Sequence, residues 1–432
     1  MSREMKDSGI EWIGEIPKEW EVIRAKSIFT QRSSKGNTTA VLLSATQKHG
    51  MLPQSMLEGV VQTNANTDLQ TFKTVHKNDY VISLRSFQGG FEMSNYEGVC
   101  SPAYQVFYNH VPISHQFFWL LFKSYGFIDK INSLTVGIRE GKNIQYKDFA
   151  NMMLAVPSLS EQQKIADYLN TVCGDIDDMV ALQEKMIEEL KAYKQSVITE
   201  AVTKGLNPNV PMRDSGIDWI GEIPKHWNTM RFKHYFKTGK GLNITKGDLT
   251  PEGAPIVSYG QVHSKYNTGT KLDDVLIRHL PESLTEGCHS SKVSIGDFIF
   301  ADTSEDINGC GNAVYVDKEI GLFAGYHSVI AFGKYSHENK FLSYLFLTDC
   351  WRSQIRMRVT GIKVFSISQN ILNQTTLILP PKIEQQQIVS YLDTICSEID
   401  SLISIKQKKI EELKDYKKSV IYEYVTGKKQ VN

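Results

Sequence analysis

Four polar loops carry side chains that could hydrogen-bond to the edges of nucleic-acid bases. Arginine and lysine suit the O6 and N7 acceptors of guanine, and glutamine and asparagine suit the N6 and N7 atoms of adenine. Glycines in three of these four segments would let the backbone approach a phosphate closely. The loops are LRSFQGG (84–90), GIREGKN (137–143), KTGKGLNITKGD (237–248) and RSQIRMR (352–358).

These loops supply most of the candidate nucleic-acid-binding residues. Any single one of them could equally be a solvated surface charge, and only their clustering in glycine-bearing loops favours a binding role. The candidates are Lys35, Arg85, Gln88, Gly89, Arg139, Lys142, Asn143, Lys240, Asn243, Thr245, Lys246, Arg352, Arg356 and Lys363.

The chain carries no strong catalytic motif. It has no G-x-x-x-x-G-K-[ST] loop, dinucleotide fingerprint, [DNS]-P-P-[YF] motif, H-E-x-x-H or G-x-S-x-G. The six cysteines form neither a C-x-x-C pair nor a zinc-like cluster with histidine. We therefore expect no catalytic residue, no metal site and no disulfide framework, with Cys173 and Cys396 packed in helix seams.

Composition places the chain among soluble proteins of more than one domain. The 432 residues contain 48 Lys and Arg and 48 Asp and Glu, so the formal net charge is zero. No signal peptide or membrane span of about 20 apolar residues is visible. The chain is therefore expected to be cytoplasmic and not to bind a membrane.

A short phrase occurs twice. DSGIEWIGEIPKEW ends at Trp20 and DSGIDWIGEIPKHW ends at Trp227, and residues 5–20 match residues 212–227 at an offset of 207. We call the two copies the first and second clip. Each is too short to fold alone, so the simplest role is to fasten an insert to a helix. Exposed aromatic and apolar side chains could also bind a partner, and the candidates are Trp12, Ile13, Trp20, Trp219, Ile220 and Trp227.

A long helical segment also occurs twice, at residues 161–203 and 384–426, with an offset of 223. Apolar residues recur at alternating spacings of four and three, which is typical of a coiled-coil seam. The sequence predicts a capping box at Ser160 for the first helix and entry through Pro380 and Pro381 for the second. Only Gln183 interrupts the first stripe, and Lys406 and Lys409 interrupt the second. The natural partner of each helix is its copy, in an antiparallel pair; the alternative is that each helix packs on its own domain.

The two inserts between these repeats have diverged. Fragments such as TVGIRE (135–140) and VTGIKV (359–364) are among the few that correspond. Both inserts mix short strands with one amphipathic helix, expected over residues 113–131 and 338–359, which indicates the α+β class. Segments 21–156 and 228–379 carry 13 against 9 and 16 against 14 basic and acidic residues, so each insert is mildly basic.

Along its whole length the chain resembles the DNA-specificity (S) subunit of type I restriction–modification systems. The resemblance rests on the duplicated DSGIxWIGEIPxxW, the duplicated EQQxI…IEELKxYKxSVI helices and QGG…YEGVCSPAYQVF (88–107). It implies two α/β target-recognition domains joined by two long antiparallel coiled-coil helices, in a pseudo-two-fold internal repeat. Its domains would be the clip 1–20, recognition domain 21–157, central helix 158–204, linker and clip 205–227, recognition domain 228–380 and C-terminal helix 381–432.

The resemblance also implies partners. Each recognition domain would read one half of a split target in double-stranded DNA. Two methyltransferase (M) subunits would bind the duplicated framework, and restriction (R) subunits would join through them. S-adenosylmethionine, ATP and Mg would bind those partners, leaving this chain without a cofactor and without catalysis. The alternatives are a specificity subunit of a methylation-only system, a two-domain scaffold that binds only proteins, and an enzyme such as a nuclease.

Overall fold

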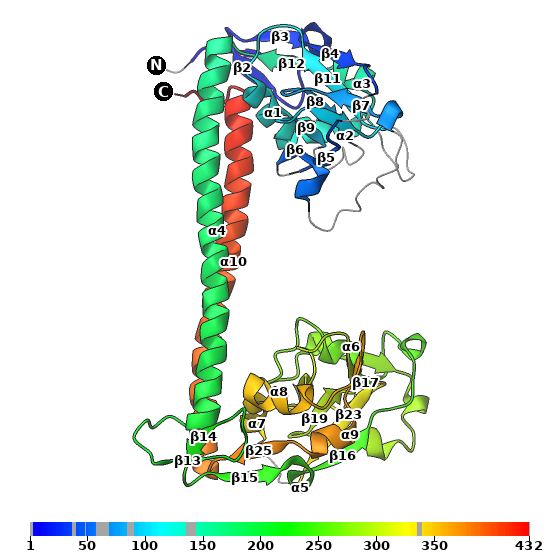
Figure 1. The fold of residues 1–432 in the computed structure, drawn as a ribbon, viewed down its shortest axis with the longest axis vertical. Helices are drawn as coiled ribbons and strands as arrows, with labels where there is room; N and C mark the ends of the chain where they lie inside the picture. Colours follow the sequence, from blue (N-terminus) through cyan, green and yellow to red (C-terminus); the bar gives the residue numbers. More distant parts are fainter. Residues whose placement is uncertain are drawn as a thin grey trace. The chain divides into compact units, whose positions relative to one another are not determined.

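The computed structural model describes residues 3–36, 40–47, 49–57, 69–83, 90–134, 144–334 and 339–431. The chain divides into two compact units, one formed by residues 1–184 with 406–432 and the other by residues 185–405 (Figure 1). We call them unit 1 and unit 2. Each unit contains one clip, one insert and a stretch of both long helices, so the two helices are shared between the units.

Unit 1 is built around an antiparallel sheet whose strand order is β4-β11-β8-β9. Two smaller pairs, β5–β6 and β7–β10, lie beside it, while β3 pairs with β12 and the first clip folds as the hairpin β1–β2. The strands are β1 (Met5–Asp7), β2 (Glu15–Pro17), β3 (Glu21–Arg24), β4 (Phe29–Arg32), β5 (Leu43–Thr46), β6 (Gly50–Pro53), β7 (Lys73–Val75), β8 (Tyr80–Ile82), β9 (Phe91–Met93), β10 (Gly98–Cys100), β11 (Gln105–Asn109) and β12 (Met153–Val156).

Unit 2 has a sheet of the same kind, with the order β16-β23-β19-β21 and antiparallel pairing throughout. A three-stranded sheet, β18-β17-β22, flanks it; β15 pairs with β25, β20 pairs with β24, and the second clip folds as the hairpin β13–β14. The strands are β13 (Met212–Asp214), β14 (Glu222–Pro224), β15 (Asn228–Arg231), β16 (Phe236–Lys240), β17 (Ala254–Val257), β18 (Arg278–Leu280), β19 (Phe298–Ala301), β20 (Thr303–Ser304), β21 (Ala313–Tyr315), β22 (Phe323–Ala324), β23 (Ser328–Gly333), β24 (Phe365–Ser366) and β25 (Thr376–Leu379).

The inserts are therefore related in fold although their sequences have diverged. In both inserts, the strand that follows the clip pairs with the strand that precedes a long helix. The strands of the four-stranded sheet come between these two strands in the sequence. The α+β class and the internal repeat predicted from the sequence are confirmed.

The single amphipathic helix predicted in each insert is wrong, because both helices are broken near the middle. Unit 1 has α1 (His115–Lys123), α2 (Tyr125–Ser133) and α3 (Tyr146–Ala150). Ser124 leaves the helical conformation at φ −67° and ψ 141°. In unit 2, Thr348 separates α7 (Lys340–Phe346) from α8 (Asp349–Arg356) by accepting a hydrogen bond from the Trp351 amide. A side-chain N-cap overrides the periodic pattern at Thr348. Ser124 makes no such cap bond to α2, and its hydroxyl instead donates to the Leu121 carbonyl at the end of α1, at 2.7 Å. The other short helices of unit 2 are α5 (Phe232–Tyr235), α6 (Tyr259–Val262) and α9 (Gln369–Asn373).

The two long helices are α4 (Leu159–Lys204) and α10 (Lys382–Val425). Helix α4 begins earlier than predicted: the Glu161 amide donates to Ser158 Oγ at 3.3 Å, so Ser158 rather than Ser160 caps it. Gln162 also ties this end to the insert, because its side chain accepts from the Ser114 amide and donates to the Pro157 carbonyl. Helix α10 follows Pro380 and Pro381 as expected.

Within each unit, α4 and α10 lie side by side and run antiparallel. In unit 1, Lys417 pairs with Asp177 at 2.7 Å; in unit 2, Lys194 pairs with Asp400 at 2.7 Å. Lys194 and Lys417 are counterparts in the repeat, at the offset of 223, and so are Asp177 and Asp400. The two units therefore contain the same ion pair with the roles of the two helices exchanged. The polar break in the seam also has a partner, because Lys406 Nζ donates to Gln183 Oε1 at 3.4 Å. Those two positions are each other's counterparts in the repeat.

The helix seam is buried where it faces the insert of each unit, and parts of it away from the inserts are buried as well, as at Ile187 and Ile410. Ile165, Leu169 and Cys173 are buried in unit 1, and their counterparts Ile388, Leu392 and Cys396 are buried in unit 2. The predicted packing of both cysteines in the seam is confirmed.

Candidate nucleic-acid interface and subunit surfaces

Unit 2 contains a polar cleft of about 890 Å³ at the edge of its main sheet. Lys240 ends β16 there, Asn243 follows in the loop, and Gln369 enters from the start of α9. Gln369 holds the cleft together, because its Nε2 donates to the Gly239 carbonyl at 2.9 Å. We call this the unit 2 cleft; its polar side chains come from four separate stretches of the sequence.

Close approach of two backbone segments shapes one wall of the cleft. A Cβ at Gly241 would lie 1.8 Å from the Gly325 carbonyl oxygen, so only glycine fits at this position. Next to this contact, His327 adopts a left-handed φ of 51°, which is uncommon for a residue other than glycine. Its Nδ1 lies 3.3 Å from Asp302 Oδ1. The wall therefore presents an imidazole and a carboxylate in a conformation that the surrounding fold maintains.

Of the candidates predicted in the loop 237–248, Lys240 and Asn243 line this cleft and are exposed. Lys246 is exposed as well. Thr245 has an internal role, because its backbone amide and its hydroxyl both donate to Asp248 Oδ2, at 2.7 and 2.9 Å. This capping interaction lowers the pKa of the Asp248 carboxyl. Three of the four candidates thus remain available to a ligand, whereas Thr245 stabilises the loop.

The side chains of Arg352 and Arg356 in α8 form hydrogen bonds and an ion pair within the protein. Arg352 Nε donates to the Phe346 carbonyl at 2.7 Å, and burial lowers its pKa to about 10. Arg356 pairs with Asp349 at 2.8 Å, and its Nη2 donates to the Asn308 carbonyl. These arginines join α8 to its neighbours, whereas Lys363 is exposed. The nucleic-acid role of all three stays a prediction.

In unit 1, Lys35 is exposed and its backbone forms an isolated bridge with Lys73. Burial lowers the pKa of Lys73, whose ammonium group contacts the Tyr104 carbonyl. The remaining candidates of unit 1 lie outside the described residues: Arg85, Gln88, Gly89, Arg139, Lys142 and Asn143.

Sequence reasoning missed His327, Asp302, Gln369 and Asn370, which also line the unit 2 cleft. None of these four residues lies in a glycine-rich basic loop, and such loops were the sequence pattern that predicted the other binding residues. Only the pairing of β16 with β23 and of β20 with β24 brings them together.

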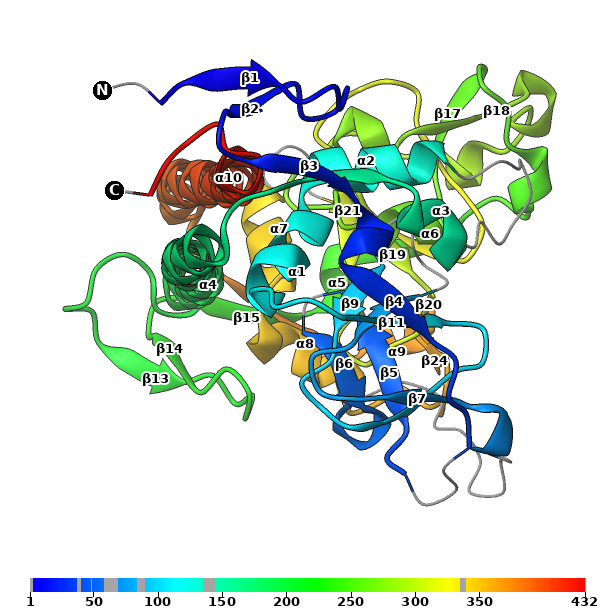
Figure 2. The same cartoon turned by 90° about the horizontal axis from the view of Figure 1, so that it is seen from above.

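The first clip is fastened to both long helices within unit 1. Trp20 is buried, and its Nε1 donates to Glu161 Oε2 of α4 at 3.1 Å. Tyr422 of α10 donates to the Trp12 carbonyl at 2.7 Å. Ile13 is buried in the same core. The fastening role predicted for the clip therefore accounts for Ile13 and Trp20, whose side chains have no free surface for a partner. Figure 2 shows the β1–β2 hairpin beside the end of α10.

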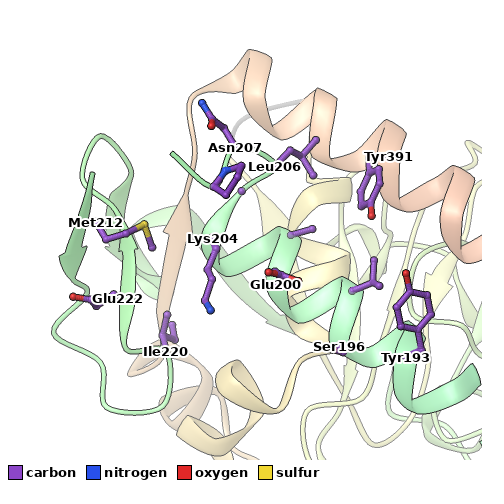
Figure 3. A pocket seen from close by; sticks show the side chains of 14 residues that line it. Tyr193, Ser196, Glu200, Lys204, Leu206, Asn207, Met212, Ile220, Glu222 and Tyr391 are labelled. Atoms are coloured by element: carbon purple, nitrogen blue, oxygen red, sulfur yellow. The ribbon is translucent and has the colours of Figure 1, made fainter. Parts of the chain in front are cut away.

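The second clip is packed less completely. Trp227 is buried like Trp20, but Trp219 is 46% exposed, and Ile220 is only partly buried. A groove of about 840 Å³ separates Ile220 and neighbouring clip residues from the end of α4, with Tyr193 and Tyr391 at its far side (Figure 3). In unit 1, Tyr422 and Tyr424 are bulky where α4 has Thr199 and Ala201. The smaller side chains of Thr199 and Ala201 leave more space beside α4 in unit 2 than Tyr422 and Tyr424 leave beside α10 in unit 1.

Each unit also exposes a matched set of four apolar side chains on its long helices. Unit 1 exposes Tyr168, Met179, Leu182 and Tyr416, at 36, 53, 55 and 56%. Unit 2 exposes their counterparts Tyr391, Leu402, Ile405 and Tyr193, at 42, 47, 64 and 54%. Every member of one set is 223 residues from a member of the other. We call these two sets the exposed helix patches.

Within the described ranges, no group of three or more His, Cys, Asp or Glu side chains could hold a metal ion. Nor is any described helix both long and apolar enough to span a membrane.

The fold defines a class of protein: two α+β inserts of like sheet order, each with its own polar surface, within a repeat that also duplicates a long helix. The chain belongs to the type I restriction modification DNA specificity domain family, whose model matches residues 17–192 and 224–415. Members of this family are the specificity subunits of type I restriction–modification systems, and they are not the catalytic component.

Known relatives agree with this assignment. The type I restriction enzyme MjaVIII specificity subunit of Methanocaldococcus jannaschii is 23% identical over 96% of this chain and 94% of its own length. The EcoKI specificity subunit of Escherichia coli is 24% identical over 65% of this chain and 60% of its own.

Solved structures share the fold. A chain from a study of complex assembly and conformational transition of the type I R-M system has a TM-score of 0.69, at 14% identity, with 95% of this chain and 98% of that chain covered. The HsdS subunit from Thermoanaerobacter tengcongensis gives a TM-score of 0.52 at 14% identity, covering 95% and 98%.

Proposed function

We propose that the chain reads a bipartite target in double-stranded DNA, with one unit contacting each half-site, and that it organises two methyltransferase subunits and, through them, restriction subunits. The observation that carries this proposal is the contrast between a repeated scaffold and unlike recognition surfaces. The exposed helix patches match residue for residue across the repeat. The inserts share a sheet order but differ in their polar loops.

The matched patches favour two equivalent partners. Apolar side chains that are about half exposed on both units would be covered by the same surface of two identical subunits, because equivalent positions require equivalent contacts. Tyrosine and methionine are enriched at such interfaces. Trp219 and the groove beside it extend this surface in unit 2.

The polar loops favour DNA as the ligand of the inserts. Lys240, Asn243 and Lys246 combine phosphate-binding cations with an amide that suits adenine. Each insert carries only a small positive excess, so few phosphates would be neutralised by this chain alone and binding should be modest without its partners. Cofactors would be held by those partners: S-adenosylmethionine by the methyltransferase subunits, and ATP and Mg by the restriction subunits.

The decisive experiment maps methylated adenines in a host that expresses this chain with its methyltransferase subunit. We expect a split target, and replacement of residues 21–156 by the corresponding segment of another specificity subunit should change one half of the target only. Loss of all adenine methylation on that exchange, with the complex still assembled, would contradict the one-unit-per-half-site model.

The same expression host and methylation map also distinguish the alternative functions of the chain. A methylation-only system would give the same map without cleavage of unmodified DNA when every subunit encoded beside the chain is present. A scaffold that binds proteins only would leave the map unchanged after the exchange. A nuclease would cleave duplex DNA as the isolated chain with a divalent metal ion.

A further inference from the structure

The loop of residues 360–364 in unit 2 exposes apolar side chains at its tip. Ile362 is 97% exposed and Val364 is 52% exposed, with the cationic Lys363 between them. We call this segment the tip loop. A single exposed apolar residue means little by itself, but three further observations concern this one.

The shape of the tip loop is fixed by its base. Thr360 forms a bridge with Ser366, and β24 pairs with β20 (Figure 2). Gly361 has a φ of +148°, and a Cβ there would lie 2.0 Å from the Val364 carbonyl oxygen. The turn therefore requires glycine and holds Ile362 away from the body of the unit.

The base of the tip loop belongs to the unit 2 cleft. Ser366 and Thr303, which pair across β24 and β20, both line the cleft, as does Gln369 a few residues further on. A ligand that occupies this cleft would therefore lie next to the tip loop.

The third observation comes from the repeat. VTGIKV (359–364) and TVGIRE (135–140) are among the few fragments that the diverged inserts share, and both contain glycine, isoleucine and a cation in succession. Side chains that read different bases in the two half-sites should differ between the inserts. A fragment kept in both should make a contact that does not depend on the base sequence.

We propose that the tip loop inserts Ile362 as an apolar wedge at a base step of the bound duplex, while Lys363 pairs with a neighbouring phosphate. The proposal rests on DNA being the ligand of unit 2. Isoleucine is among the side chains that proteins insert between base steps, and a lysine contact to a phosphate carries no sequence information. The wedge would grip target and non-target duplexes alike and would leave base discrimination to the cleft.

The test uses the full chain assembled with its methyltransferase subunits and two duplexes of about 40 base pairs. One duplex carries the target found by methylation mapping and the other lacks it. We expect Ile362→Ala to weaken binding to both by a similar factor of about tenfold or more, because burial of an isoleucine is lost. Lys363→Ala should lower the slope of log affinity against log salt by about 0.9, whereas Ile362→Ala should leave that slope unchanged. Ile295→Ala, which removes an exposed loop isoleucine outside the cleft lining, is the matched control.

A second readout locates the wedge. With 2-aminopurine placed in turn at each adenine of the half-site read by unit 2, except the methylated adenine that a methyltransferase subunit takes out of the stack, fluorescence should rise at one step with the native complex and with Lys363→Ala, but not with Ile362→Ala. Target-selective binding with native affinity in the Ile362→Ala complex would overturn the wedge while leaving the proposed function intact. Loss of a methyltransferase subunit from that complex, with DNA affinity unchanged, would overturn it in favour of a protein contact. Absence of target selectivity in the native complex would instead count against the proposed function.

Discussion

Among single residues, Glu92 of unit 1 stands out as a carboxylate almost without solvent contact. It is 1% exposed and accepts a hydrogen bond from Lys123 at 2.6 Å. Burial raises the pKa of Glu92 to about 7, and burial also lowers the pKa of Lys123. Desolvation therefore outweighs the attraction between the two charges, as is common for buried ion pairs.

This pair predicts a pH dependence of stability. Glu92 binds its proton more tightly in the folded chain than in the unfolded chain, where its pKa is near 4.5. Its contribution to the free energy of unfolding is therefore fully present below about 4.5 and is lost as the pH rises through about 7. Urea unfolding of the native chain and of Glu92→Gln, at pH 5 and pH 8, checks this. The native chain should lose stability relative to the variant between the two values, and a constant difference would contradict the assignment.

The positions of Asn243 and Lys240 in the unit 2 cleft predict different roles for these two residues in DNA binding. Asn243→Ala should relax base discrimination at one position of one half-site, by about 1–3 kcal/mol. Under the proposed function Lys240 binds a phosphate, so Lys240→Ala should weaken binding to target and non-target duplexes equally and lower the salt slope. Competition binding with single-base variants of the target measures both effects. Thr245→Ala, which removes a capping hydroxyl near the cleft, should change neither readout at a salt concentration where the loop stays folded.

Residue type alone could suggest these candidates but could not decide among them. Lys240 and Asn243 line the cleft. Arg352 and Arg356 are also predicted candidates, but they donate hydrogen bonds to the carbonyl groups of Phe346 and Asn308. The Phe346 carbonyl is free to accept because α7 ends there, whereas Asn308 lies in the loop between β20 and β21. His327 and Asp302 carry no local signal at all, because strand pairing across a long stretch of sequence brings them together.

At the scale of secondary-structure elements, the long helices were the most predictable. Their 3.5-residue apolar period, few helix breakers and clear boundaries fix both α4 and α10 within two residues at most termini. The secondary structure of the inserts was less predictable. Ser124 and Thr348 end one helix and begin another within runs whose apolar spacing continues, and periodicity cannot register such a break.

The polar contact between Gln183 and Lys406 should set the register of α4 against α10 at a cost in stability. We expect the double variant Gln183→Leu with Lys406→Leu to raise the free energy of unfolding by about 1 kcal/mol, since both side chains are partly buried. Thermal and urea unfolding of the full chain measure the change. The adjacent exposed residues Gln407 and Lys408, both changed to leucine, form the control and should bring little or no gain. A loss of stability in the seam variant would show that the polar contact stabilises the pair.

At the scale of the whole molecule, the repeat could be read directly from the sequence, including the equivalence of the two clips and of the two long helices. The common sheet order of the inserts could not, because strand topology depends on pairings between distant segments that retain little sequence similarity. The matched exposed helix patches likewise required the structure, since periodicity marks a residue as apolar without showing whether it is covered.

These patches predict how many partner subunits the chain holds. Replacing Met179 and Tyr416 in unit 1 by serine should remove one of two methyltransferase subunits, and replacing Leu402 and Tyr193 in unit 2 should remove one as well. All four changes together should remove both, because each patch would serve one partner. Native mass spectrometry of the co-expressed complex counts the subunits. Ile295→Ser is the control for loss of exposed apolar area, and full occupancy in the four-fold variant would place the partner surface elsewhere.

The contact between Gln183 and Lys406 has a consequence for the inheritance of this gene. These positions are copies of one another, so any recombination event that made the two coding repeats uniform would bring identical residues face to face. Overwriting the first copy with the second would oppose two lysines, whose ammonium groups repel each other. Overwriting in the other direction would oppose two glutamines, whose amides can hydrogen-bond. At this one contact, gene conversion toward the second copy should therefore cost stability, whereas conversion toward the first copy should not.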